Sequence, residues 1–382
     1  MNQTSARLAQ HWSVIQGYLF PILEEELGPL SASHKSVAQS LELIRIEEFI
    51  PSSHGMPWRP AKHRAAIARA FVAKAVLGLS TTRALLDRLA CDPQLRRICG
   101  WETAQSIPGE DKFSRDFALF AEIGLAAKVH EALIVQHCEE RIIGHISRDA
   151  TAIAARETPV YQKPKTDKSP KRKRGRPKKG EVVPKPLPTR LERQAGMTLE
   201  EMLSDLPTSC DRGCKRNSKN SVEYWVGYKL HLDVSDAHLP VSAILTSASL
   251  HDSQAALPLA FMSRRRVTNL YDLMDGAYDA KIIHRCSRFL GHVPLIAPNF
   301  KGSAKGKAEH STECRRRKLL NLTVPEDARY KERTTVERVF SRLKDEFGGR
   351  HVRVRGHAKV LTHLMFGLLA LTADQLLRLV PG

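Results

Sequence analysis

YKERTTVERVFSRLK, residues 330–344, has the spacing of one helix with four polar side chains on a single stripe. At 100° per residue, offsets of three, seven and fourteen keep these side chains within about 60° of arc: Tyr330, Arg333, Glu337 and Lys344. A carboxylate beside two cations and a phenol suits a metal ion that holds a DNA phosphate, with the cations on neighbouring phosphates. The alternative is a solvated helix with i, i+4 ion pairs, each worth only about 0.3–0.5 kcal/mol.

Length and charge favour a polyanionic partner. The 382 residues are enough for two or three domains, and 60 Lys and Arg against 41 Asp and Glu give a formal net charge of +19. No run of eighteen apolar residues occurs, and the N-terminal sequence lacks the pattern of a secretory signal. We therefore expect a soluble, intracellular protein that binds nucleic acid and no membrane.

The seven cysteines are scattered and odd in number, which argues against a disulfide framework. Only Cys210 and Cys214 lie close together. They are interpreted as reduced thiols in a flexible segment, with a structural zinc site as the alternative.

Strand and helix patterns alternate from residue 142 onward. The expected elements are a strand at 142–151, a hairpin over 222–249 that turns at residues 236–238, a helix from about 252, a strand at 269–274, a helix at 280–290 and a strand at 293–298. Residues 301–318 are interpreted as a basic loop, and residues 357–379 as an apolar helix that packs on the sheet. This order, closed by the helix of residues 330–344, is that of the RNase H-like fold.

The stripe spacing Tyr-x2-Arg-x3-Glu-x6-Lys resembles the signature of bacterial insertion-sequence transposases of the DDE class, the group that includes the transposases of Tn5 and Tn10. The phrases GYKLHL, SLHDSQ and MDGAYDA resemble the same family at the corresponding places. The resemblance covers about residues 140–375. We therefore expect an α/β fold, with an RNase H-like catalytic domain at residues 141–375 preceded by an all-helical, DNA-binding N-terminal domain at residues 1–140.

Three carboxylates at the ends of core elements are the predicted catalytic and metal-binding residues: Asp149, Asp275 and Glu337. Mg²⁺ and Mn²⁺ prefer hard oxygen ligands, and two such ions about 4 Å apart assist an in-line phosphoryl displacement. The sequence leaves competitors, because Asp272 lies in the same strand as Asp275 and Glu332 lies near Glu337. Asp149 could also be a strand-end cap, and Asp275 part of an Asp-Gly turn.

The resemblance implies that Mg²⁺ (or Mn²⁺) is bound by the three acids, while Tyr330, Arg333 and Lys344 contact phosphates of the element end. Water would first cut one strand, and the released 3′-hydroxyl would attack target DNA. The implied partners are double-stranded DNA and a second copy of the chain, in the bacterial cytoplasm with the nucleoid. Residues 299–329 contain no Trp on which a flipped base could stack as in those relatives, so a hairpin intermediate is left open.

A basic, Pro-rich insert interrupts the pattern at residues 157–220. Between residues 163 and 193, thirteen Lys or Arg stand against three acids, with six prolines, so we expect this segment to be disordered. Within it, a run resembles an AT-hook, whose Arg side chains enter a narrow A·T minor groove: Lys173, Arg174, Arg176, Lys178 and Lys179. The alternative is an unspecific polybasic linker.

Apolar residues at three and four spacing predict helices from about residue 5 to residue 140. Two short helices are expected over residues 79–101, the first capped by Ser80 or Thr81 and the second beginning at Asp92-Pro93. If this region binds element ends, phosphate contacts would come from Arg83, Arg88, Arg96 and Arg97. An ordinary helical bundle is an equal alternative.

Two other functions stay open. An RNase H-like DNA nuclease would use the same carboxylates without strand transfer. A domesticated DNA-binding regulator would use the basic insert alone, and the three acids argue against it.

Overall fold

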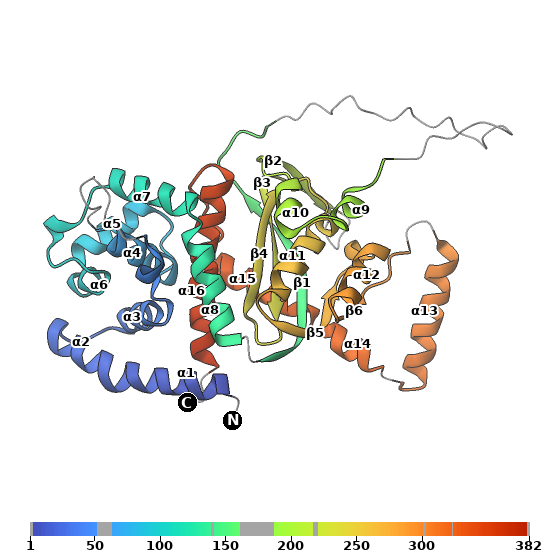
Figure 1. Ribbon diagram of the computed structural model, residues 1–382, viewed down its shortest axis with the longest axis horizontal. Helices are drawn as coiled ribbons and strands as arrows, with labels where there is room; N and C mark the ends of the chain where they lie inside the picture. Colours follow the sequence, from blue (N-terminus) through green and yellow to red (C-terminus); the bar gives the residue numbers. More distant parts are fainter. Residues whose placement is uncertain are drawn as a thin grey trace.

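The computed structural model describes residues 3–51, 63–138, 141–160, 187–216, 221–300, 303–322 and 324–379. In Figure 1 the N-terminal helices lie on one side, the sheet lies in the centre, and α11 (Ala256–Arg264) and α12 (Lys281–Phe289) lie beyond it. The long helix α16 (His357–Arg378) runs between the N-terminal helices and the sheet.

One six-stranded mixed sheet forms the centre of the molecule. Its strands are β1 (Ile142–Ala154), β2 (Asp211–Arg216), β3 (Val222–Ser235), β4 (Pro240–Ser247), β5 (Thr268–Met274) and β6 (Val293–Ile296). The order is β2-β3-β1-β5-β6, with β4 also paired to β3. β1 pairs antiparallel with β3 and parallel with β5, and β6 is parallel to β5. This mixed sheet with flanking helices is consistent with the RNase H-like fold.

The strands expected from the sequence are present with small shifts in their ends. β1 continues three residues beyond the expected end because the long strand β3 pairs with it as far as Ala154. The β3–β4 hairpin turns at the expected place, where His238 adopts a left-handed backbone with φ of 61°. The helix expected from Asp252 begins as a 3₁₀ turn, η4 (Asp252–Ala255), that leads into α11.

Part of the predicted insert is folded, which corrects the expectation of disorder across 157–220. Residues 187–216 form α9 (Arg190–Gln194), α10 (Leu199–Asp205) and β2. Both helices begin with a capping box, in which a Thr side chain and a Glu three residues later satisfy each other's backbone N–H groups. α10 packs on α11 and buries Met202 in an apolar cluster with Leu257. The AT-hook-like residues fall within 161–186, outside the described residues.

The described residues from 3 to 138 form helices only. They are α1 (Gln3–Val14), the π-helical turn η1 (Ile15–Leu19), α2 (Phe20–Leu27), α3 (Ala32–Ile44), η2 (Ile46–Phe49), α4 (Arg64–Val76), α5 (Thr82–Cys91), α6 (Pro93–Cys99), η3 (Ala104–Ser106), α7 (Glu110–Glu122) and α8 (Leu125–Cys138). Thr81, rather than Ser80, caps α5, because its hydroxyl accepts from the Ala84 N–H at 3.0 Å. Asp92 caps α6 in the same way, through the Leu95 N–H at 3.0 Å.

Helix α16 joins the N-terminal helices to the sheet. It contacts α3, α4, α7 and α8 on one side and β4 and α15 (Thr335–Asp345) on the other. Phe366 packs against Phe71 and Phe117, with ring centroids 5.7 and 6.2 Å away. The buried apolar residues of both regions form one continuous cluster, so a separate N-terminal domain is not confirmed. α16 has the length and composition of a membrane span, but 72% of its apolar window is buried inside the protein, as in a core helix.

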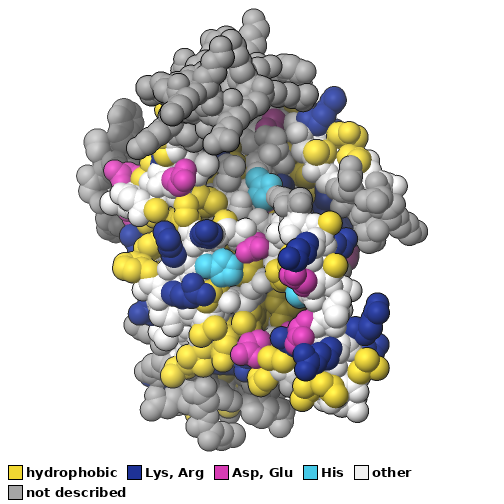
Figure 2. All heavy atoms as spheres, turned by 90° about the vertical axis from the view of Figure 1, so that its right-hand side faces the viewer, with side chains coloured by type: hydrophobic (Ala, Val, Ile, Leu, Met, Phe, Trp, Pro, Cys, Tyr) yellow, Lys and Arg dark blue, Asp and Glu magenta, His cyan; other side chains and the backbone are white. Residues whose placement is uncertain are grey.

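Two expectations for residues 301–344 need correction. Residues expected to form a basic loop form α13 (Ala304–Leu319), a helix with no buried residue. The signature stretch is not one α-helix, because α14 (Pro325–Tyr330) is followed by the 3₁₀ turn η6 (Lys331–Thr334) and then by α15 (Thr335–Asp345). Figure 2 views the side that carries α12, β6 and α13. It shows Lys and Arg side chains distributed over this face, with Asp and Glu side chains among them.

Candidate active site

One face of β1 meets the signature stretch. Side chains alternate along a strand, so Ser147, Asp149 and Thr151 share a face and Arg148 lies on the other. The Ser147 hydroxyl donates to the backbone carbonyl of Glu332 at 3.2 Å, and Lys344 Nζ donates to the Thr151 hydroxyl at 2.7 Å. These two contacts hold η6 and α15 along the strand on either side of Asp149.

Arg333 lies between two of the predicted acids. Its guanidinium is 3.7 Å from the Asp149 carboxylate and donates to Glu337 Oε1 at 3.0 Å. Burial raises the pKa of Tyr330, and the charges of Asp275 and Asp149 raise it further against the opposing effect of Arg333. Tyr330 and Arg333 therefore lie near Asp149, and Glu337 is linked to Asp149 through Arg333, although the helix is interrupted between them.

Asp275 follows the C-terminal end of β5, the parallel neighbour of β1. Its Oδ1 accepts from the Ala277 N–H at 2.9 Å and caps η5 (Gly276–Tyr278), so the Asp-Gly turn does form. Burial raises the pKa of Asp149 to about 6, and the nearby charge of Asp275 adds to the shift, while the Ala150 N–H and Arg333 oppose it. The two carboxylates are thus close enough to repel each other.

The competing acids have other partners. Asp272 is buried, accepts from the Asn269 side-chain amide at 3.0 Å and contacts His292 Nδ1 at 3.2 Å. Burial alone would raise its pKa, but His292 and the charge of Arg148 hold the pKa of Asp272 below its usual value. Asp272 therefore belongs to the core. No described contact joins the exposed side chain of Glu332 to the predicted acids.

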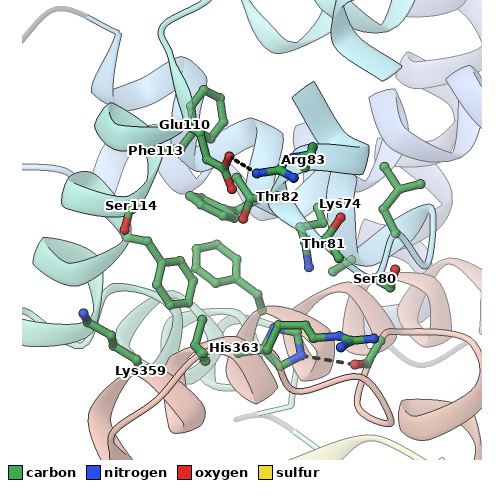
Figure 3. Close-up of a pocket in the computed structure, with 18 of the residues that line it drawn as sticks. Lys74, Ser80, Thr81, Thr82, Arg83, Glu110, Phe113, Ser114, Lys359 and His363 are labelled. Atoms are coloured by element: carbon green, nitrogen blue, oxygen red, sulfur yellow. Dashed lines mark hydrogen bonds and ion pairs between the residues drawn. The ribbon is translucent and has the colours of Figure 1, made fainter. Parts of the chain in front are cut away.

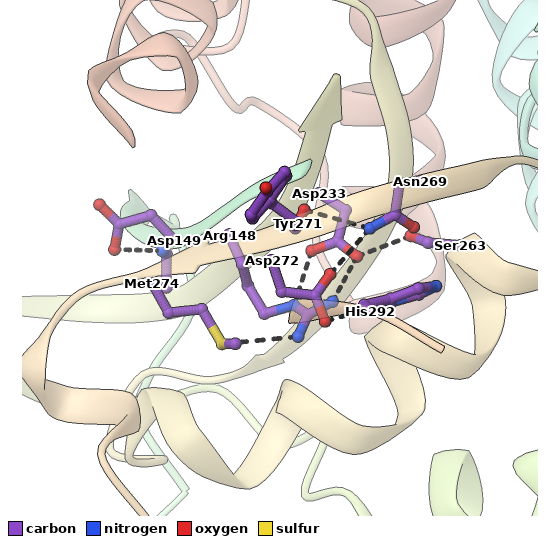
Figure 4. A network of polar contacts seen from close by, with 10 residues as sticks. Arg148, Asp149, Asp233, Ser263, Asn269, Tyr271, Asp272, Met274 and His292 are labelled. Carbon is purple, nitrogen blue, oxygen red and sulfur yellow. Dashed lines mark hydrogen bonds and ion pairs between the residues drawn. The ribbon is translucent and has the colours of Figure 1, made fainter. Parts of the chain in front are cut away.

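A buried ion pair lies behind the site. Arg148 donates to both oxygens of Asp233 at 2.7 Å, and Ser263 donates to the same carboxylate at 2.6 Å. Figure 4 shows the Asp149 carboxyl on the opposite side of β1 from the Arg148 guanidinium. A bidentate pair of this kind fixes side-chain geometry on both strands, and so it fixes which face Asp149 occupies.

Three residues near the site were not assigned to it from the sequence. Asp252, at the expected start of a helix, forms an ion pair with Lys229 Nζ at 2.8 Å, and its charge also raises the pKa of Asp149. The Tyr278 ring is buried and its hydroxyl has no hydrogen-bond partner among the described residues. Burial, Asp252 and Asp149 raise the pKa of Tyr278 well above its usual value. The sequence did hold a signal for Lys229, Asp252 and Tyr278, because each lies in one of the phrases GYKLHL, SLHDSQ and MDGAYDA that resemble the family.

The acids suit a hard divalent cation by the chemistry of their donors. Asp149, Asp275 and Glu337 offer only carboxylate oxygens, and two of the three repel each other in a desolvated setting. No group of three or more His, Cys, Asp or Glu side chains in the described part of the chain is arranged to hold a metal ion. Glu337 instead faces Arg333, whose positive charge stands between it and Asp149.

The predicted phosphate contacts of the N-terminal helices separate into two kinds. Arg96 donates to the backbone carbonyls of Leu89 and Ala90, and Arg97 contacts Glu102 and the Glu26 carbonyl. These two arginines hold the helices together. Arg83 and Arg88 are more exposed, and each contacts one carboxylate, Glu110 and Asp92 respectively.

Cys210 and Cys214 are free thiols, the first buried and the second exposed. Cys214 lies in β2, and the Cys210 carbonyl accepts from the Val160 N–H at 2.8 Å. The segment is therefore part of the fold rather than flexible.

Comparison with known families gives two matches. Residues 206–373 match the family described as Transposase DDE domain, and residues 29–118 match the family described as Transposase domain (DUF772). The first match includes Asp275 and Glu337 and begins after Asp149. No curated protein and no solved structure matches the chain. The two matches cover separate parts of the sequence, and together they support a DNA transposase of the DDE, insertion-sequence kind.

Proposed function

We propose that the protein cuts DNA at the ends of an insertion sequence and joins those ends to target DNA by two-metal phosphoryl transfer. The observation that carries this proposal is the convergence of Asp149, Asp275 and the Arg333–Glu337 pair at one end of the parallel strands β1 and β5. Ligand chemistry in open α/β sheets belongs at this end. The Tyr-Arg-Glu-Lys spacing further suggests the Tn5/Tn10-like group.

In this proposal Asp149, Asp275 and Glu337 bind Mg²⁺ or Mn²⁺. The ions would supply activation of the attacking oxygen and charge stabilisation at the leaving oxygen. Arg333 would exchange its contact with Glu337 for a DNA phosphate, because a guanidinium binds either group bidentately. Tyr330 keeps its proton at neutral pH, since its pKa is raised, and so can donate to a phosphate oxygen.

Lys344 would bind a phosphate farther along the same strand of DNA. Burial and the charges of Arg350 and Lys215 lower its pKa, which means that several cations already crowd this position. A phosphate would relieve that repulsion. The N-terminal region of residues 1–140 and the AT-hook-like run are proposed to hold the flanking DNA, and cutting two ends together implies a homodimer on DNA.

The test is cleavage of DNA that carries the ends of the element from the protein's own gene. Asp149→Ala, Asp275→Ala and Glu337→Ala should each abolish Mg²⁺-dependent strand cleavage and joining while DNA binding persists. Glu332→Ala is the matched control, because it removes an exposed acid from the same stretch and should leave cleavage intact.

The outcomes separate the alternatives. Full cleavage in any of the three Ala variants removes that residue from the site. Cleavage without joining indicates a nuclease, and specific binding without any cleavage in the wild type indicates a regulator.

A further inference from the structure

A basic cleft lies between the N-terminal helices and the segment that leads into α16. It has a volume of about 640 Å³ and is lined by α4, the start of α5, α7, Arg156 and residues 347–366. Figure 3 shows Lys74, Thr81 and Thr82 together on one side, with Lys359 and His363 on the other. None of the predicted catalytic residues lines it.

The side chains that line this cleft carry mostly positive charge. Its lining contains six Lys or Arg and one acid, Glu110, which pairs with Arg83 at 3.2 Å. The five remaining cations have no ion pair within the described residues: Lys74, Arg156, Arg353, Arg355 and Lys359. Such a concentration of unpaired cations in a concave site is suited to an anion.

Among these cations, Lys74 gives the strongest indication of a bound anion. It is only 9% exposed, and its amino group makes no hydrogen bond or ion pair within the described part of the chain. Burial lowers the pKa of Lys74 to about 8, with no carboxylate near enough to offset the effect. His363 beside it donates to the Gly348 carbonyl at 3.1 Å, and burial and the Lys74 charge lower the pKa of His363 to about 4. A buried ammonium without a partner is costly unless a ligand supplies one.

The start of α5 adds to the same site. Ser80, Thr81 and Thr82 line the cleft, and α5 is ten residues long. The first N–H groups of a helix are not used within the helix and favour anions. Hydroxyls, helix N–H groups, a buried ammonium and arginines together are the donors that a phosphate group needs.

The cleft is also within reach of DNA held at the predicted catalytic site. Asp149 and Arg156 are seven residues apart along and just beyond β1, or about 20 Å at the rise of a strand. One strand of duplex DNA presents about six phosphates over that length. Lys344 lies between the two points, at Thr151.

We infer that this cleft binds backbone phosphate of the DNA whose end lies in the catalytic site, with Lys74 as the buried counter-charge and Arg353 and Lys359 at its edge. The inference rests on the proposed function for the identity of the DNA. It adds a contact surface that joins the two family-matched regions, because α4 and α5 lie in one match and Lys359 in the other.

The experiment measures binding alone, so it is independent of cleavage. Full-length protein is titrated in EDTA against a fluorescent 30-bp duplex that carries the element end, from about 50 to 300 mM NaCl. Lys74→Met and the double variant Arg353→Ala/Lys359→Ala should each weaken binding about 3- to 10-fold and reduce the salt slope by about one phosphate contact per lost cation. Lys128→Ala, an exposed lysine on α8 outside the cleft, is the control for lost charge alone.

Folding is checked in parallel. Lys74→Met should melt at or above the wild-type temperature, because it removes an unpaired buried charge. If Lys74→Met does not fold, the double variant decides the matter, since Arg353 is exposed and Lys359 half-buried. Affinity and salt slope equal to those of Lys128→Ala would overturn the inference.

A small-anion arm distinguishes the source of the phosphate. If inorganic phosphate at 10 mM raises the melting temperature of the wild type but not of Lys74→Met, and DNA affinity is equal in both, the cleft takes a free anion and the DNA inference is wrong. If the wild type binds no duplex at all, the proposed function itself fails. Loss of cleavage with retained binding leaves the inference standing.

Discussion

Asp149 is held in the folded protein under electrostatic strain. Its pKa is raised from 3.8 to about 6, chiefly by burial. Below pH 4 the carboxyl is protonated in both the folded and the unfolded chain, so it adds no penalty to the free energy of folding. Above pH 6 it is ionised in both, and the folded state carries the full penalty. The metal-free protein therefore loses stability through this group as pH rises from about 4 to about 6.

Asp149→Asn should remove that penalty. In EDTA at pH 8 we expect the free energy of unfolding to rise by about 1–3 kcal/mol, from a shift of roughly two pKa units reduced for partial exposure. The gain should disappear near pH 4. Urea denaturation of the wild type and Asp149→Asn at pH 4, 6 and 8 measures the difference in their free energies of unfolding. Adding Mg²⁺ at pH 8 should reduce that difference.

Asp272→Asn is the matched control with the opposite sign, because the pKa of Asp272 is held below its usual value. That substitution should destabilise the protein at pH 8 and have less effect as pH falls through the pKa of the folded carboxyl. A pH-independent difference between Asp149→Asn and the wild type would contradict the assigned cause.

How far the site could be predicted differs from residue to residue. The spacing of Tyr330, Arg333 and Glu337 was enough to group them, because a 3₁₀ turn changes their angles without moving them to another face. Asp275 could not be separated from Asp272 by pattern, since the difference is the burial of Asp272 beside Asn269 of the same strand and His292 just before β6. The catalytic roles themselves stay predictions.

Among the elements, the two short helices α9 and α10 were not predicted, because the composition of their segment is typical of disorder. The surrounding charge and prolines predicted disorder, yet Thr189 with Glu192 and Thr198 with Glu201 form two capping boxes visible in the sequence. Arg190 also binds Asp205 at 2.8 Å and Gln254 at 2.7 Å. The strands and the hairpin were predicted because their alternation is local. The packing of α10 on α11 is not local.

These contacts change where the basic insert can be removed. Deleting residues 161–186 removes eleven Lys or Arg and two acids but none of the described helices. With a short Gly-Ser linker in its place, we expect an unchanged melting temperature and a flatter dependence of DNA affinity on salt. Deleting 163–193 instead should lower the melting temperature, because it removes the Thr189 cap and Arg190. An equal melting temperature for both deletions would mean that α9 contributes nothing to stability.

The AT-hook-like run can be tested within the intact chain. Arg174→Ala with Arg176→Ala should reduce preference for A·T-rich over G·C-rich duplexes, since a narrow A·T minor groove attracts arginine. Competition binding with the two duplexes measures that preference. Equal weakening on both would identify the run as an unspecific tether.

At the scale of the whole molecule, the buried apolar core contains residues from both sides of the boundary expected near residue 140. The N-terminal helices pack on one side of α16, and Phe366 packs against Phe71 and Phe117. Sequence periodicity predicted these helices correctly, but it carries no information on which distant helix fills the space between them.

Residues 1–140 expressed alone should therefore not fold cooperatively. We expect helical circular dichroism with a broad, non-cooperative thermal transition and binding of a hydrophobic dye, because the apolar faces turned toward α16 are uncovered. Fusing residues 355–379 to that fragment through a Gly-Ser linker should restore a sharp transition. A sharp transition in the fragment without α16 would show that residues 1–140 are an independent domain.

The separation of α16 from the N-terminal helices along the sequence also sets an order of events during synthesis. Roughly 240 residues separate the last N-terminal helix from the end of α16, which corresponds to roughly 10–50 s of translation at about 5–20 residues per second. During that interval the first helices lack the segment that completes their core. A ribosome-bound chain is thus exposed to chaperones and proteases until α16 emerges. A premature stop at any codon before α16 leaves both the N-terminal helices and the sheet without the helix that packs between them.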